Sequence, residues 1–150
     1  MKHWITSLMV TAALLVGAGT SHVWAAKSFS QPLSGTYITQ KYGKQHRAID
    51  YQRYKRDKGF VGSIGDGKVI RVKRDAKCAY GWHVMVDHGD GYVSVYSHLS
   101  GISVLQGQKV KKGKKVGNMG KTGRVRAKYP ILHLEVIKDG KKINPMSVMK

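Results

Sequence analysis

The sequence predicts an all-β fold of antiparallel sheets and hairpins in one small domain. Three runs of β-branched and aromatic residues alternate with a period of two and are bounded by glycine or aspartate: residues 68–73, 82–87 and 92–98. The chain also carries 18 glycines and 3 prolines, and no convincing amphipathic helix follows residue 25. Its 150 residues are enough for one core and exclude a large multidomain enzyme.

The remaining elements follow from local composition. A polar lead-in over residues 26–37 precedes a short strand around residues 36–39. The glycine-containing segments 88–91 and 138–141 predict hairpin turns, and residues 109–121 predict tight turns that join short strands. Near the C-terminus, residues 130–135 alternate like a strand. We therefore expect a single domain over residues 38–150, with no linker and no second domain.

The charge of the chain predicts an anionic partner. It holds 27 lysines and arginines against 8 acidic residues, a formal net charge of +19. Such an excess suits nucleic acid, anionic lipid or an anionic cell envelope. The single cysteine, Cys78, excludes an internal disulfide framework and a four-cysteine zinc site.

The first 25 residues predict an export signal, which decides among these partners. A short basic start, Met1 to His3, precedes an uncharged apolar stretch over residues 4–19, and the small residues Val23 and Ala25 suit cleavage after about Ala25. A retained membrane anchor is the less favoured alternative, because the apolar stretch is short. We expect an exported protein in the periplasm, cell envelope or extracellular space, with no stable membrane span after cleavage. Nucleic acid is then not an expected partner, whereas an anionic envelope surface is.

Two basic segments have different interpretations. The lysine-rich segment 109–115 is interpreted as a solvated edge that blocks unwanted strand pairing. The segment 51–58 is interpreted as a basic loop. Its four cations follow a candidate ligand closely, so we expect them beside the functional site: Arg53, Lys55, Arg56 and Lys58.

Histidines are the main candidates for metal-binding residues. Of seven histidines, five remain after the predicted cleavage. His46 and Asp50 stand four residues apart in a strand-entry segment, a plausible zinc-binding pair. In the strand 130–135, His133 shares a face with residues 131 and 135, while Leu132 and Leu134 point to the core. His133 is therefore a third ligand candidate.

The order of these motifs resembles the lysostaphin-like zinc metallopeptidases, which have the duplicated-hybrid-motif fold and cut peptide bonds in peptidoglycan. The resemblance runs from about residue 38 to residue 145. The matching segments are residues 46–50, 59–67, 80–81, 86–92, 96–99, 107–113, 120–123, 130–135 and 144–145. It implies a groove of β-sheets in which Zn²⁺ is held by His46, Asp50 and His133, with His98 as one of two catalytic histidines beside the reacting water. The implied substrate is peptidoglycan or its peptide stems.

One departure from this family pattern bears on activity. Active relatives read His-x-His in the last strand, where this chain has Ile131 in place of the first histidine. Strand alternation keeps Ile131 on the face of the metal cleft. His83 and His88 are alternative replacement bases, although structural or surface roles are favoured for both. Two functions therefore stay open: a secreted zinc endopeptidase with impaired activity, or a binding module or regulator of a wall hydrolase that lacks catalysis.

Overall fold

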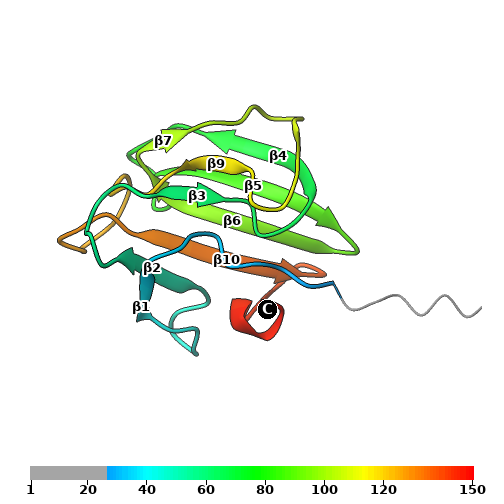
Figure 1. Cartoon of the computed structure of the whole chain (residues 1–150), viewed down its shortest axis with the longest axis horizontal. Helices are drawn as coiled ribbons and strands as arrows, with labels where there is room; N and C mark the ends of the chain where they lie inside the picture. Colours follow the sequence, from blue (N-terminus) through cyan, green and yellow to red (C-terminus); the bar gives the residue numbers. More distant parts are fainter. Residues whose placement is uncertain (1–26) are drawn as a thin grey trace, which may run out of the picture.

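Two antiparallel sheets form the part of the chain that the computed structural model describes, residues 27–150 (Figure 1). The larger, eight-stranded sheet has the order β1-β2-β10-β6-β5-β4-β8, with β11 paired to β10, and the smaller has the order β3-β9-β7. The elements are β1 Thr36–Gln40, β2 Ile49–Arg53, β3 Phe60–Gly62, β4 Gly67–Lys73, β5 Trp82–Gly89, β6 Tyr92–Leu99, β7 Gly101–Ile102, β8 Lys109–Val110, β9 Lys115–Asn118, β10 Leu132–Lys138, β11 Lys141–Ile143 and the 3₁₀ helix η1 Pro145–Ser147. The prediction of an all-β fold is confirmed.

The predicted export signal, residues 1–25, lies outside the described residues. No helix within residues 27–150 is both long and apolar enough to cross a membrane.

The three alternating runs form β4, β5 and β6, and the turn 138–141 connects β10 to β11 as expected. Two boundaries were predicted wrongly. β5 continues through Gly89, so the turn to β6 consists of Asp90 and Gly91, whose φ angles of 52° and 74° suit the twist of a hairpin. Residues 51–53 belong to β2 rather than to a loop, because all three pair with β1 and Tyr51 also pairs with β10.

The hydrophobic core lies between the sheets and is one continuous cluster. Leu132, Leu134 and Val136 of β10 are fully buried in it, as the alternation predicted. Burial of each such side chain stabilises the fold by roughly 1.5–3 kcal/mol. Phe29, in the predicted lead-in, joins the same core and bridges to Met149, so the two ends of the described chain meet there.

A buried polar network supports the centre of the larger sheet. His88 Nδ1 lies 2.8 Å from the carbonyl oxygen of Asp66, and His88 Nε2 lies 2.7 Å from Ser94 Oγ, which is 2.9 Å from the Tyr96 hydroxyl. A carbonyl only accepts, so Nδ1 donates and Nε2 accepts from Ser94. Both nitrogens are therefore satisfied in the neutral imidazole, and burial lowers the pKa of His88.

This network predicts a loss of stability in mild acid. Because the pKa of His88 is lower in the folded state than its ordinary value of 6.5, the unfolded chain takes up the proton first as the pH falls. The contribution of His88 to the free energy of unfolding should therefore be largest above pH 6.5 and decrease below it. Denaturant unfolding from pH 7.5 to 5 should show a smaller decrease for His88→Gln than for the natural chain. Equal decreases would contradict this role of His88.

Candidate metal centre

The pairing of β2 with β10 places Asp50 directly opposite His133. Directly opposed residues of an antiparallel pair carry their side chains on the same face, close enough to touch. On the other side of β10, His133 pairs with Ser97 of β6, the neighbour of His98. Three adjacent strands thus bring the predicted residues to one place.

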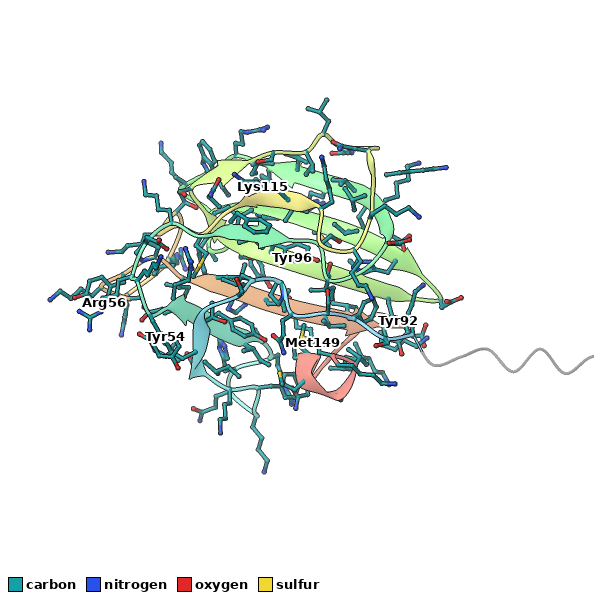
Figure 2. All side chains as sticks on the ribbon, viewed as in Figure 1. Tyr54, Arg56, Tyr92, Tyr96, Lys115 and Met149 are labelled. Atoms are coloured by element: carbon teal, nitrogen blue, oxygen red, sulfur yellow. The ribbon has the colours of Figure 1, made fainter. Side chains whose placement is uncertain are left out.

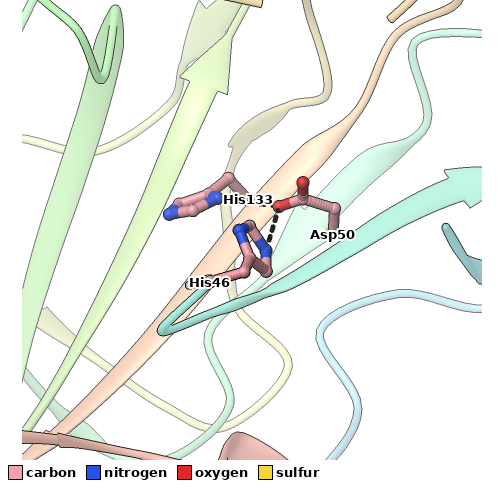
Figure 3. Close-up of side chains that lie close together, drawn as sticks. All are labelled: His46, Asp50 and His133. Atoms are coloured by element: carbon pink, nitrogen blue, oxygen red, sulfur yellow. Dashed lines mark hydrogen bonds and ion pairs between the residues drawn. The ribbon is translucent and has the colours of Figure 1, made fainter. Parts of the chain in front are cut away.

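His46 enters this place from the segment before β2 (Figure 3). Its Nε2 lies 3.3 Å from Asp50 Oδ1, and His133 Nδ1 lies 2.7 Å from the same oxygen. One ligand atom from each of the three residues lies within 4.8 Å of the other two. The structure therefore brings together His46, Asp50 and His133, the three residues expected to hold the metal.

The donor set fits a catalytic zinc ion. Two imidazole nitrogens and one carboxylate oxygen are ligands that zinc prefers, and three protein ligands leave a fourth position open. Apart from its 3.3 Å contact with Asp50, the buried His46 Nε2 makes no hydrogen bond within residues 27–150, and coordination would satisfy this nitrogen. His133 Nε2 lies 3.1 Å from Glu135 Oε1, so donation to Glu135 leaves Nδ1 as the coordinating atom.

Glu135 organises a polar cluster beside the three residues. Besides His133, its Oε1 accepts from the Tyr80 hydroxyl at 2.9 Å and from Lys142 Nζ at 2.8 Å. Burial alone raises the pKa of Glu135, but these three donors outweigh it, so the pKa is lowered. Strand alternation places Glu135 on the site face. Tyr80 lies in the matching segment 80–81, but no sequence signal indicated that Tyr80 and Lys142 reach Glu135 from other segments.

The same contacts act on His133. Burial lowers its pKa, but hydrogen bonds to Asp50 and Glu135, together with their charges, raise the pKa to about 9. In the absence of a metal this imidazole is therefore cationic at neutral pH. Metal binding at Nδ1 would displace that proton.

His98 lies near the cluster at the end of β6. Its ring centroid is 5.6 Å from that of His133, and its Nδ1 is 2.9 Å from the carbonyl oxygen of Thr122. Nδ1 therefore donates, and Nε2 keeps its lone pair. Burial, reinforced by nearby His133, lowers the pKa of His98 despite the opposing effects of Thr122 and Asp50. The φ of 62° at His98 is unusual for a residue with a side chain and typical of functional sites.

These side chains line a groove of about 720 Å³. Ile131 lines it too, as strand alternation predicted, with only 6% of its surface exposed. The rim is basic, with Arg47, Arg124 and Arg126 among the lining residues. The groove therefore combines a metal-binding cluster, a neutral imidazole and a cationic margin.

The two remaining histidines are buried elsewhere in the sheet. His83 Nδ1 lies 2.9 Å from the carbonyl oxygen of Gly81, and His88 belongs to the network with Ser94. Neither is a lining residue of the groove. Both positions agree with the structural roles favoured for them.

Sequence comparisons show which known proteins this chain resembles. The model of peptidase family M23 matches residues 44–145. The chain is 42% identical over 86 residues to peptidoglycan DD-endopeptidase ShyA of Vibrio cholerae, covering 57% of this chain and 19% of that protein. It is 36% identical over 86 residues to murein hydrolase activator NlpD of Salmonella typhimurium, covering 57% and 22%. The chain thus spans about a fifth of the length of these curated relatives.

Solved structures share the architecture. A zinc-containing peptidase from Vibrio cholerae superposes with a TM-score of 0.60 and 32% identity, covering 79% of this chain and 36% of that one. Lysostaphin from Staphylococcus simulans superposes with a TM-score of 0.68 and 23% identity, covering 83% and 53%. The second likeness concerns the fold alone, and it confirms the prediction of a lysostaphin-like fold.

Proposed function

The chain belongs to peptidase family M23, and from this membership we propose that it is an exported zinc metalloendopeptidase that cleaves peptide cross-links of peptidoglycan. The observation that carries the proposal is the convergence of His46, Asp50 and His133 in the groove. Relatives in the family include a named peptidoglycan endopeptidase. The net charge of +19 is in keeping with an anionic envelope surface as a partner.

In this proposal His46 Nε2, Asp50 Oδ1 and His133 Nδ1 hold the zinc ion. When bound, zinc activates water as a nucleophile near neutral pH and polarises the scissile carbonyl. Glu135 fixes the ring of His133 through Nε2, and Lys142 and Tyr80 fix Glu135 in turn. The orientation of the ligands is therefore set by a second carboxylate that lies outside the metal cluster.

His98 is the proposed proton-handling residue. Its Nε2 is a free acceptor because Nδ1 donates to Thr122, and its lowered pKa keeps the imidazole neutral at pH 7. Nε2 can accept the proton of the attacking water and pass it to the departing amine. This is the role of a general base and then a general acid.

Ile131 limits this mechanism in our proposal. It occupies the groove wall where the resemblance implies a second histidine, and its side chain neither donates nor accepts a proton. A positioned acid or base contributes about 10²–10⁴-fold in rate. We therefore propose a slow peptidase that relies on His98 alone.

A second candidate function uses the same groove without catalysis. The apolar Ile131 favours it, as does the similarity to a protein named as a murein hydrolase activator. In that case the chain is a peptidoglycan-binding module or a regulator of a wall hydrolase. The convergent metal-binding cluster favours the enzyme, because binding alone has no evident need of it.

The first prediction is the metal content. We expect about one zinc ion per chain, because the three donors converge at the spacing that zinc accepts. Elemental analysis of protein dialysed against trace zinc should show this ion in the natural chain and its loss in His133→Ala. The control is Asp66→Asn, at an exposed aspartate paired with Lys111, which should keep the metal. Full zinc retention in His133→Ala would refute the ligand assignment.

The second prediction concerns position 131. Ile131→His should raise the rate of cleavage of cross-linked muropeptides by about 10²–10⁴-fold, because it supplies the missing proton-handling group. Ile131→Asn is the matched control, since it adds polarity without a group that titrates near pH 7. Product release is measured by chromatography, with and without a chelator.

Two results would change the conclusion about position 131. A natural chain as fast as Ile131→His would show that His98 suffices. If neither protein cleaves while both bind zinc and peptidoglycan, the regulator or binding module replaces the enzyme.

The third prediction concerns the basic connection between β2 and β3. Arg53 pairs with Asp57 at 2.6 Å and Arg56 contacts Tyr129, so Lys55 and Lys58 are the exposed cations left for a polyanion. Pelleting with peptidoglycan should weaken as salt rises, since exposed charges act over about 8 Å at physiological ionic strength. Lys55→Gln with Lys58→Gln should reduce binding more than the matched pair Lys114→Gln with Lys115→Gln. Equal effects, or binding independent of salt, would exclude the connection from substrate capture.

A further inference from the structure

A second hollow lies beside the metal groove and is built from aromatic side chains. It has a volume of about 330 Å³ and is lined by Tyr37, Tyr54 and Arg56. The Tyr37 and Tyr54 ring centroids are 5.1 Å apart with an angle of 39° between the rings, and Tyr54 is 72% exposed. Figure 2 shows Tyr54 and Arg56 at the end of the molecule where β2 leads into the connection to β3. We name these residues, together with Tyr129, the tyrosine platform.

The fold holds the platform in place. Tyr37 of β1 pairs with Gln52 of β2, and Tyr54 follows at the end of β2. Arg56, with a φ of 56°, turns its guanidinium onto Tyr129 in the loop before β10: Cζ lies 4.6 Å from the ring centroid, and Nη1 donates to the hydroxyl at 3.0 Å. This contact joins two segments that are distant in the sequence, and Tyr54 stays largely exposed.

Gln52 joins the platform to the metal groove. Its Oε1 accepts from the Tyr37 hydroxyl at 2.8 Å, and its Nε2 donates to the carbonyl oxygen of Tyr129 at 3.5 Å. Gln52 also lines the metal groove. The tyrosine platform and the metal groove therefore have Gln52 as a common neighbour, which places them side by side.

We propose that the tyrosine platform binds an amino-sugar oligosaccharide, so that the glycan strand of peptidoglycan rests there while its peptide stem enters the groove. This identification of the sugar rests on the proposed function. A pyranose ring presents C–H groups on its face, which suit the negative face of an aromatic ring. Its hydroxyl and acetamido oxygens need donors, and the guanidinium of Arg56 offers several. Tyr54 is exposed, Tyr37 and Tyr129 are half-buried, and Arg56 is the one cation in the lining of the hollow. Such a surface suits a largely uncharged ligand better than a phosphate backbone.

The test uses a peptide-free probe, the β-1,4-linked hexamer of N-acetylglucosamine, with the full mature chain and isothermal titration calorimetry. Tyr54→Ala should weaken binding about two- to ten-fold, the loss expected for one aromatic contact. Because Tyr54 is largely exposed, this variant should keep its fold, which unfolding curves check. Leu105→Ala, at another exposed apolar residue, is the matched control and should bind like the natural chain.

Separate variants distinguish the platform from the metal site. His133→Ala should bind the hexamer normally, since the sugar does not use the metal. In cleavage assays, Tyr54→Ala should raise the KM for intact sacculi but not for cross-linked peptides freed of sugar. Sugar binding without any cleavage would support the platform while the proposed peptidase fails. Cleavage of free peptides without sugar binding would overturn the platform and leave the peptidase standing.

Two other outcomes also overturn the proposal. Equal sugar binding by Tyr54→Ala and the natural chain would place the sugar elsewhere. Tighter, Tyr54-dependent binding of single-stranded oligothymidylate would identify a stacking site for bases instead.

Discussion

The register between β2 and β10 is the constraint on which the site depends. It sets Asp50 opposite His133, and side chains alternate along a strand, so a slip of one residue would turn His133 into the core and expose Leu132 or Leu134 to the groove. The fully buried Leu132, Leu134 and Val136 hold that register. The apolar face of β10 thus positions the polar face, and the geometry of the metal cluster follows from the packing of the core.

A series of hydrogen bonds connects the opposed residues of β2 and β10 to other segments. His133 contacts Asp50 on one side and Glu135 on the other, and Glu135 is held by Tyr80 and Lys142. Each of these polar groups has a hydrogen-bond or ion-pair partner, and such pairing offsets the free-energy cost of burying their charges. By contrast, the buried His46 Nε2 lies 3.3 Å from Asp50 but makes no hydrogen bond in the described part of the chain. Coordination of a metal ion would satisfy this nitrogen too.

Much of this arrangement could be predicted from the sequence, because it depends on local alternation. The strands at residues 68–73, 82–87 and 92–98 and the face shared by Ile131 and His133 follow from periodicity. Contacts between distant segments could not be predicted that way: Lys142 on Glu135, and Arg56 on Tyr129. The segment 51–53 was assigned to a loop as part of the basic segment 51–58, yet its three residues pair with β1, and Tyr51 also pairs with β10, so it is a strand. The family resemblance supplied the ligand set, which spacing alone left open.

The central claim is that this register builds a zinc site from His46, Asp50 and His133. Diffraction data collected on either side of the zinc absorption edge, from crystals grown with zinc, test it most directly. The account predicts an anomalous peak about 2.0–2.2 Å from His46 Nε2, His133 Nδ1 and a carboxylate oxygen of Asp50. His133 Nε2 should still be hydrogen-bonded to Glu135. A peak at other residues, or none at this cluster with zinc in excess, would contradict it.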